Sequence, residues 1–138
     1  MTRVLIIEDY FDFAYSIRDN FEFKGYEAEY CISSINAVEY ALTFRPDWVI
    51  IDVRMPYKMG LAVFKELNEK ADFEFSVVFY SVYWGEKSII DEFSKEKNIP
   101  DEVKIHKTTD LEQDISERII PALKNGYLKG GCQITVKK

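Results

Sequence analysis

Residues 4–9 read VLIIED, and this stretch, together with WVIID at residues 48–52, decides the fold that the sequence predicts. Each is an unbroken apolar run that ends directly in acids, Glu8 and Asp9 after the first run and Asp52 after the second. Strands that are apolar along their whole length are typical of a parallel sheet covered by helices on both faces. Ligands bind outside the carboxyl ends of such strands, so the three acids are predicted to lie at a ligand site.

Five strands are predicted, and their patterns suggest an order. The runs at about residues 3–7, 48–53 and 75–80 are apolar almost throughout and should be central, whereas those at 28–32 and 103–105 alternate and should form edges. The order 2-1-3-4-5 fits, which is the flavodoxin-like arrangement of a doubly wound α/β fold with helices on both faces of a five-stranded parallel sheet. Its switch point lies between strands one and three, where the acids should converge.

Helices are predicted where apolar residues recur at three- and four-residue spacing. They cover about residues 12–24, 35–42, 61–67, 86–97 and a stretch from 110 onward. Ser34 is expected to cap the second helix, with Ile35 facing inward, and Ile90 is expected to pack inward from the fourth. Pro121 should kink or end the last helix, because proline cannot donate a backbone hydrogen bond.

The composition narrows the class of protein. The chain has 138 residues and a net charge of −6, which disfavours nucleic-acid binding by this domain, since such binders usually carry a basic stripe. Cys31 and Cys132 are too few for a disulfide framework. No apolar run approaches the roughly 18 residues of a membrane span, and no signal peptide is visible. We expect a cytoplasmic protein without a membrane partner.

Glu8, Asp9 and Asp52 indicate a site for a hard cation. Mg²⁺ prefers oxygen ligands and is usually held by one or two carboxylates together with phosphate oxygens. The alternative is that the acids stabilise helix N-termini, but three acids at two adjacent strand ends favour the metal. Ser81 ends the fourth strand and Lys107 follows the fifth, where a hydroxyl and an ammonium can contact a phosphoryl group. Their simpler roles are an ordinary loop serine or helix cap for Ser81 and a solvated lysine for Lys107.

Taken together, these residues resemble the receiver domain of bacterial two-component response regulators. The matching residues are Ile6-Ile7-Glu8-Asp9, Gly25-Tyr26, Pro46-Asp47, Ile50-Ile51-Asp52-Val53-Arg54-Met55-Pro56, Gly60, Ser81 and Lys107. The spacing Asp-x-x-Met-Pro followed by Gly60 is the most specific part of the resemblance. It covers about residues 2–124, so a receiver domain is expected over residues 1–125, with a tail or linker at 126–138.

The resemblance implies a phosphorylation-activated signalling switch. Asp52 would accept a phosphoryl group from a sensor histidine kinase or a histidine phosphotransfer protein. Asp9 and Asp52 would bind Mg²⁺ directly, together with the backbone carbonyl of Arg54, and Glu8 would act through a bound water. Such a domain is not an enzyme for other substrates, because it catalyses only its own phosphorylation and dephosphorylation.

Ser81 and Lys107 would contact the phosphoryl group after transfer. In similar proteins the resulting shift reshapes the surface formed by the fourth helix, the fifth strand and the fifth helix. A downstream protein, or an effector domain missing from this chain, would bind there. The sequence leaves open whether the protein forms a homodimer.

The chain departs from the receiver pattern at three positions. Val82 stands where relatives usually have Ala or Gly and is predicted to narrow access to Asp52. Thr108 replaces a proline that usually fixes a turn, and Lys104 replaces a switching aromatic residue. These departures leave open a degenerate receiver that acts as a protein-interaction module without phosphate cycling. His106 is expected to be a surface residue of an edge strand.

Two further classes of protein are disfavoured by the sequence. An aspartate-dependent phosphohydrolase usually needs a second Asp two residues beyond the nucleophile, and that position is Arg54. A flavodoxin-like cofactor protein would need a phosphate-binding loop after the first strand, which is lacking. Near the end of the chain, residues 129–132 suggest a flexible linker. Residues 133–136 suggest an added strand, a partner-binding tail or the start of an effector domain.

Overall fold

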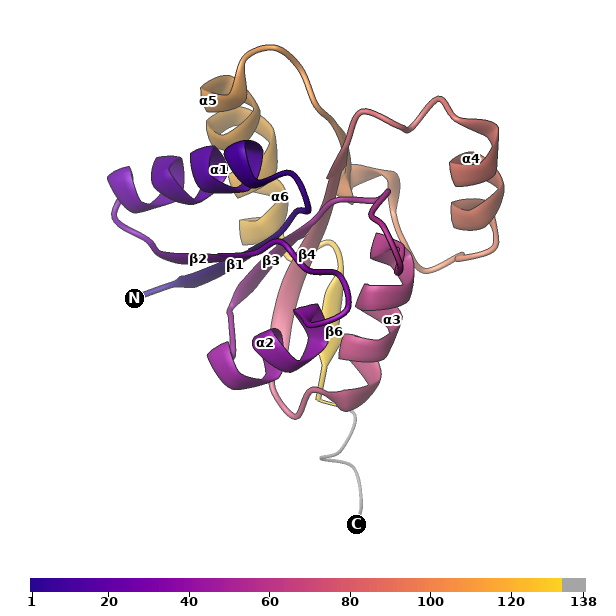
Figure 1. Ribbon diagram of the computed structural model, residues 1–138, viewed down its shortest axis with the longest axis horizontal. Coiled ribbons are helices and arrows are strands. Elements are labelled where there is room, and N and C mark those ends of the chain that lie inside the picture. Colours follow the sequence, from indigo (N-terminus) through magenta and orange to yellow (C-terminus); the bar gives the residue numbers. More distant parts are fainter. Residues whose placement is uncertain (133–138) are drawn as a thin grey trace.

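The computed structural model describes residues 1–132 and has a parallel sheet at its centre (Figure 1). The sheet is built from β1 (Arg3–Ile7), β2 (Glu27–Cys31), β3 (Trp48–Ile51), β4 (Glu74–Ser81) and β5 (Lys104–His106). These five strands are parallel and follow the order β2-β1-β3-β4-β5. The predicted doubly wound topology is therefore confirmed.

The central strands and the edge strand differ in how deeply they are buried. Residues 4–7 of β1 are completely buried, and the neighbouring strand β3 is buried from Val49 to Ile51. The edge strand β2 is only partly buried, with Glu27 exposed, Ala28 and Cys31 buried, and the two residues between them half-buried. Burying apolar side chains on both faces of the central strands removes them from water and supplies the main driving force for this arrangement.

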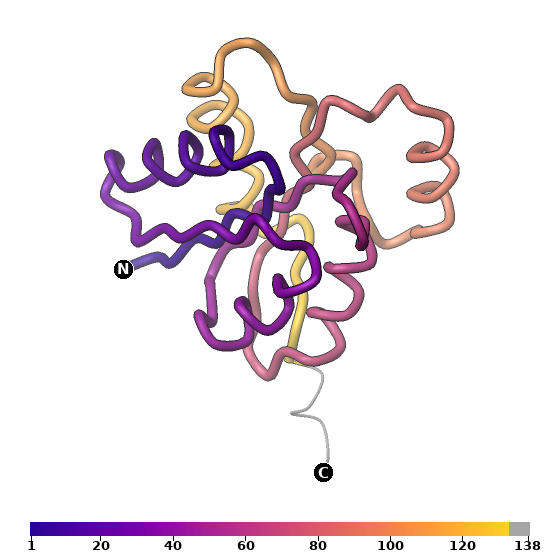
Figure 2. The backbone as a smooth tube through the Cα atoms, viewed as in Figure 1, coloured from indigo at the N-terminus to yellow at the C-terminus, as the bar shows by residue number. Residues whose placement is uncertain are grey.

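Helices cover both faces of the sheet. On one face lie α1 (Phe11–Phe23) and the C-terminal helical segments, and on the other lie α2 (Ala37–Phe44) and α3 (Gly60–Lys70), as the backbone trace shows (Figure 2). The helix α4 (Lys87–Ser94) packs Phe93 edge-on against Phe79 of β4, with 5.2 Å between ring centres. A short helical turn, η1 (Asp101–Val103), leads into β5. Within residues 1–132, no helix combines the length and apolar character of a bilayer crossing.

The last helix does not end at its proline. It comprises α5 (Leu111–Gln113), the π-helical segment η2 (Asp114–Ile119) and α6 (Ile120–Asn125), which continues beyond Pro121. Because proline has no backbone N–H, a regular helix would lose a hydrogen bond there. The wider π-helical turn directly before Pro121 changes the hydrogen-bonding pattern at the place where the donor is missing.

Three predicted details of the helices are wrong. Ser34 does not cap α2; it is buried and donates a hydrogen bond to the carbonyl of Pro56, and Asn36 occupies the N-cap position. Ile35 is 61% exposed because it lies in the turn before the helix begins, where helical spacing does not apply. Ile90 is 52% exposed, since Ile89 and Phe93 form the buried face of α4.

A sixth strand, β6 (Lys129–Gly131), corrects the prediction of a flexible linker. It pairs antiparallel with residues 74–76 of β4. Ser76 pairs with both β3 and β6, so β6 occupies the edge of β4 that the short strand β5 leaves open. The glycines allow close packing here, since a Cβ on Gly130 would lie 2.5 Å from the ring of Phe75. Residues 133–136 lie outside the described part of the chain, and the domain boundary stays a prediction.

Gly131→Ala is expected to lower the free energy of unfolding by about 1–3 kcal/mol. Gly131 has a φ of +87°, and a Cβ there would lie 1.9 Å from the carbonyl oxygen of Phe73. Urea denaturation measures the effect, with Gly85→Ala as the control, because nothing lies within 4 Å of a Cβ at Gly85. Equal stability of the two variants would show that β6 does not constrain residue 131.

Candidate functional site

The topology brings the three acids together. Ile7 at the end of β1 is in register with Ile51 at the end of β3, so Glu8 and Asp52 follow adjacent strand ends. The backbone N–H of Asp52 donates to the carbonyl of Ile7 over 2.9 Å and fixes this alignment. One carboxylate oxygen from each of Glu8, Asp9 and Asp52 lies within 4.8 Å of the others. This spacing is compatible with oxygen ligands around one divalent cation.

The site concentrates negative charge away from water. Glu8 is 4% exposed and Asp52 is 5% exposed, whereas Asp9 is half-buried. Burial, and after it the charge of Glu8, raises the pKa of Asp52 to about 8, while Lys107 acts in the opposite direction. In the absence of a cation, Asp52 therefore keeps its proton to a higher pH than an ordinary aspartate does. A bound divalent ion would relieve this repulsion.

Lys107 is directed into the acidic site and is not a solvated surface lysine. Its Nζ lies 2.8 Å from Oε1 of Glu8 and 3.8 Å from Oδ1 of Asp52. The ammonium also lies 4.3 Å from the ring centre of Phe13 and 5.6 Å from that of Tyr80. Lys107 is thus held between carboxylates and aromatic rings, as expected for a cation that serves a buried anion.

Ser81 is fully buried at the end of β4. Its Oγ accepts a hydrogen bond of 3.0 Å from the backbone N–H of Tyr83. In this conformation the hydroxyl therefore stabilises the turn that follows β4. This bond uses only a lone pair of Oγ, so the hydroxyl hydrogen of Ser81 remains available to another acceptor.

A cavity of about 390 Å³ opens over the acids. It is lined by Glu8, Asp9, Tyr10, Phe13, Asp52, Arg54, Val82, Tyr83, Lys107 and Thr108. The sequence interpretation missed Tyr10 and Phe13, although their position within one turn after Asp9 was a usable signal. The guanidinium of Arg54 lies 5.6 Å from the ring centre of Tyr83 and 2.9 Å from a carboxylate oxygen of Glu86. Arg54 and Tyr83 thus line one side of the cavity together.

Comparison with known proteins identifies the family. The family described as "Response regulator receiver domain" matches residues 4–98. The chain belongs to this family. It is thus the receiver domain of a response regulator, the class of protein that serves two-component signalling.

Curated relatives match about half of this chain. "Response regulator MprA" of Mycobacterium sp. (strain KMS) is 33% identical over 70 residues, which are 51% of this chain and 30% of that protein. "Transcriptional regulatory protein DltR" of Streptococcus agalactiae serotype III (strain NEM316) is 32% identical over 77 residues, which are 56% of this chain and 34% of that protein. The receiver chain thus spans about a third of the length of the curated relatives it matches.

Solved structures share the fold at low sequence identity. A receiver domain protein (CheY-like) from Methanospirillum hungatei JF-1 has a TM-score of 0.72 and 16% identity, with 91% of this chain and 96% of that chain covered. The response regulator protein TrrA from Thermotoga maritima, solved in complex with Mg(2+)-BeF, has a TM-score of 0.68 and 20% identity, with 89% and 100% covered. The similarity supports a CheY-like sheet and helix arrangement.

Gly60 of the receiver motif allows α3 to approach the site closely. A Cβ on Gly60 would lie 2.0 Å from the carbonyl oxygen of Asp52. The N–H of Gly60 donates to the carbonyl of Val53 over 2.8 Å, which ties the start of α3 to the residue after Asp52. Only glycine fits this contact, so the spacing from Asp52 to Gly60 has a steric cause.

The departures from the receiver pattern have defined surroundings. Val82 is 50% exposed at the cavity, and His106 is exposed on β5, as predicted for an edge strand. Lys104 extends to Asp101, with 3.1 Å between Nζ and Oδ1.

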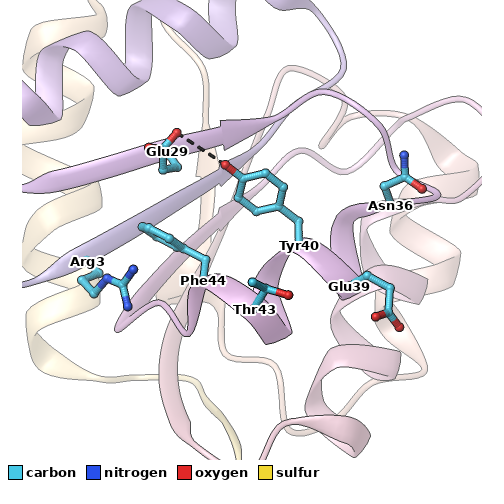
Figure 3. Close-up of a pocket in the computed structure, with 7 residues that line it drawn as sticks. All are labelled: Arg3, Glu29, Asn36, Glu39, Tyr40, Thr43 and Phe44. Atoms are coloured by element: carbon cyan, nitrogen blue, oxygen red, sulfur yellow. Dashed lines mark hydrogen bonds between the residues drawn. The ribbon is translucent and has the colours of Figure 1, made fainter.

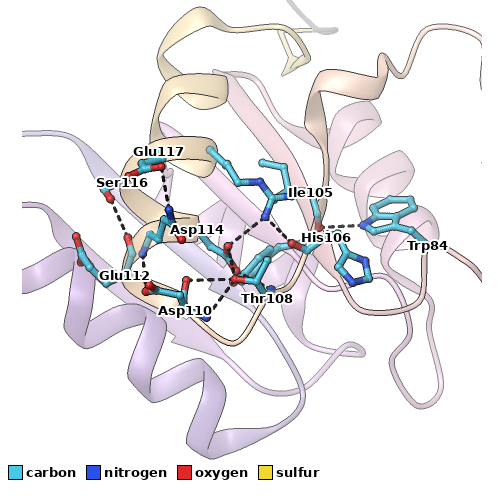
Figure 4. Close-up of polar contacts among 12 residues, drawn as sticks. Trp84, Ile105, His106, Thr108, Asp110, Glu112, Asp114, Ser116 and Glu117 are labelled. Atoms are coloured by element: carbon cyan, nitrogen blue, oxygen red, sulfur yellow. Dashed lines mark hydrogen bonds and ion pairs between the residues drawn. The ribbon is translucent and has the colours of Figure 1, made fainter.

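The indole N–H of Trp84 donates to the carbonyl of Ile105 over 2.9 Å, so the loop after β4 is connected to β5 (Figure 4). No pattern in the sequence indicated this bond.

A larger hollow of about 520 Å³ lies elsewhere, against α2 and the beginning of β1 (Figure 3). In it, the hydroxyl of Tyr40 donates to Glu29 over 3.4 Å, and the guanidinium of Arg3 lies 4.2 Å from the ring centre of Phe44. Arg3 marks the amino end of β1, opposite to the strand ends that carry the acids. This hollow is therefore separate from the candidate functional site.

Proposed function

We propose that this receiver domain is a phosphorylation-activated switch of a two-component phosphorelay and that Asp52 is its phosphoacceptor. The phosphoryl donor would be a histidine kinase or a histidine phosphotransfer protein. The observation that carries the proposal is the joint position of three carboxylates and one ammonium, with Lys107 Nζ 2.8 Å from Glu8 and 3.8 Å from Asp52. Phosphoryl transfer depends mainly on such positioning and charge neutralisation.

The residues present fit Mg²⁺. All three side chains offer hard oxygen ligands, and burial has left Asp52 with a raised pKa that a nearby cation would lower. Asp9 and Asp52 would hold the ion with the backbone carbonyl of Arg54, and Glu8 would act through water. When bound, Mg²⁺ supplies neutralisation of charge at the reacting oxygens. The complex of TrrA with Mg(2+)-BeF, a protein similar in fold, supports this assignment.

In the transfer, Asp52 would be the nucleophile and Lys107 would neutralise negative charge. A carboxylate oxygen of Asp52 forms a bond to phosphorus while the bond between phosphorus and the donor's histidine nitrogen breaks, and that nitrogen keeps the electron pair. Lys107 pairs with a phosphoryl oxygen and offsets the negative charge that the donor brings. The aromatic rings of Phe13 and Tyr80 hold the ammonium at the site without competing as anions.

The switch would begin at Ser81. A phosphoryl group adds charge and acceptor oxygens, to which the hydroxyl of Ser81 can donate while its Oγ still accepts from the N–H of Tyr83, so that the loop would move with the serine. The same loop carries Trp84, which is hydrogen-bonded to Ile105 of β5. Movement of the loop would therefore reach the surface of α4 and β5. Trp84 would provide the coupling that an aromatic residue at position 104 provides in relatives.

Tryptophan fluorescence tests this switch. Beryllofluoride with Mg²⁺ is expected to change the emission of the wild-type protein, because Trp84 lies on the moving loop. Trp84→Phe should remove the change, and Trp48→Phe, at the opposite end of the sheet in β3, should retain it. If fluorine NMR detects beryllofluoride on the protein and the Trp84 emission stays constant, the coupling through this loop is contradicted.

A receiver-like interaction module without phosphate cycling is the second candidate. One observation favours it: Val82 lines the cavity over Asp52. This candidate predicts that beryllofluoride and Mg²⁺ leave the amide resonance of Asp52 unchanged. The proposed switch predicts a large shift of that resonance.

Val82→Ala is expected to speed phosphorylation by acetyl phosphate, and hydrolysis of the product, several-fold. Val82 lines the cavity beside Asp52, and truncating it widens the path for the phosphoryl donor and for water. Radiolabel uptake and loss measure the two rates. Val82→Thr keeps the branched shape and serves as the control, which should match the wild type. Identical rates of phosphorylation and hydrolysis in the wild type and Val82→Ala would contradict the prediction that Val82 narrows access to Asp52.

A further inference from the structure

Asp114 is a buried carboxylate that the proposed chemistry does not use. It lies on η2 and is 1% exposed. It accepts hydrogen bonds from the hydroxyl of Tyr80, from the N–H of Thr108 over 2.8 Å, from the hydroxyl of Thr108 over 2.7 Å, and from Arg118 over 3.1 Å. Figure 4 shows Asp114 facing Thr108. A buried charge is tolerated only when it is satisfied in this way, so the network fixes its members firmly.

The donors of this network belong to the segments that carry the site. Thr108 directly follows Lys107, and Tyr80 directly precedes Ser81. The N–H of Lys107 also donates to the carbonyl of Ser81 over 2.9 Å, so both segments are joined beside Asp114. A single carboxylate therefore holds the backbone N–H of the residue after Lys107 and the side chain of the residue before Ser81.

Threonine at position 108 is what makes the network possible. A proline, which usually fixes the turn at this position in relatives, has no N–H and no hydroxyl. Thr108 supplies both donors to Asp114. The departure from the receiver pattern thus comes with its own means of fixing the turn.

The network also fixes the aromatic rings that the Lys107 ammonium contacts. The ring of Tyr80 stacks on that of Phe13, with 6.0 Å between ring centres, and both rings lie beside the Lys107 ammonium. The hydroxyl of Tyr80 is held by Asp114, so the ring cannot rotate away without losing that bond. The position of the Lys107 side chain is therefore restricted by the neighbouring aromatic rings as well as by the backbone at Thr108.

We propose that Asp114 is a positioning residue that, through Thr108 and Tyr80, directs the Lys107 ammonium to the phosphoryl site. The inference rests on the proposed function, in which Lys107 pairs with the phosphoryl group. Asp114 itself does not contact the reacting atoms. It takes over the task of the missing turn-fixing proline.

The test removes one side-chain hydroxyl at a time; that of Thr108 also accepts a hydrogen bond of 3.1 Å from the N–H of Asp110. Thr108→Val keeps the N–H and the shape but loses the hydroxyl, and Tyr80→Phe keeps the ring but loses its bond to Asp114. Each is expected to lower the maximal rate of phosphorylation by acetyl phosphate about tenfold. The acetyl phosphate concentration at half-maximal rate and the affinity for Mg²⁺ should stay within about twofold, because the acids are untouched. Thr108→Ser restores both donors and should restore the rate.

The controls separate positioning from stability and from the proposed function. Thr43→Val removes a hydroxyl from α2 and should leave the rate unchanged. Normal rates in Thr108→Val and Tyr80→Phe, even with lowered melting temperatures, would overturn the positioning role. If the wild type takes up no phosphoryl group, the NMR resonances of the Lys107 side chain decide instead. They should shift in both variants, and unshifted resonances would overturn the proposal on their own.

Discussion

Asp52→Asn is expected to abolish the mass gain of one phosphoryl group that the wild type acquires from acetyl phosphate and Mg²⁺. The amide is neutral and cannot act as the nucleophile, and it is a weaker ligand for a hard cation. Loss of the reacting group should lower the rate by about 1000-fold or more. Intact-protein mass spectrometry measures the gain directly.

The matched control for this experiment is Asp72→Asn. Asp72 is an exposed acid that pairs with Arg45, with 2.8 Å between the charged atoms, and it lies outside the acidic site. It should gain the same mass as the wild type. An undiminished gain in Asp52→Asn would mean that another residue accepts the phosphoryl group. No gain in the wild type would favour the non-cycling interaction module.

The metal-free protein is expected to lose stability as the pH rises from about 4 to about 8. The folded-state pKa of Asp52 is raised to about 8 by burial and by Glu8, whereas in the unfolded chain it is near its ordinary value of 3.8. Between these values the folded state holds a proton that the unfolded state releases, so raising the pH favours unfolding. The slope is at most about 1.4 kcal/mol per pH unit for one proton.

Asp52→Asn isolates this contribution. The variant does not titrate at position 52, so the difference in unfolding free energy between variant and wild type should grow with pH up to about 8 and then level off. Urea denaturation in EDTA across this range measures the difference. Mg²⁺ should reverse it in the wild type, and its apparent affinity should fall by up to about tenfold per pH unit below 8. Parallel pH profiles of the two proteins in EDTA would contradict the raised pKa.

The sheet was predictable because its pattern is local. The uninterrupted apolar runs at 4–7 and 48–51 identified central strands, and alternation in 28–32 identified an edge. The position of Glu8 and Asp52 followed from strand order alone, since adjacent parallel strands end at the same edge of a sheet. These features depend on backbone direction and on burial, and neither requires knowledge of distant side chains.

Other features depend on contacts between distant segments. The strand β6 forms because Gly130 packs on Phe75, and the same glycines in isolation suggested a linker. The pair Tyr80 and Asp114 is separated by 34 positions, so no local sequence pattern predicts it. The orientation of Ile90 was also not predictable, because apolar spacing on a short helix does not determine how much of its surface a neighbour covers.

The central claim is that Glu8, Asp9 and Asp52 hold one divalent ion beside the atom that accepts the phosphoryl group. Crystals grown with Mn²⁺ and beryllofluoride test it most directly, because Mn²⁺ is located by its anomalous scattering. We predict an anomalous peak bound by Asp9, Asp52 and the carbonyl of Arg54, with beryllofluoride on Asp52 and within reach of Lys107. Well-ordered acidic side chains with no peak between them at millimolar Mn²⁺ would contradict the account.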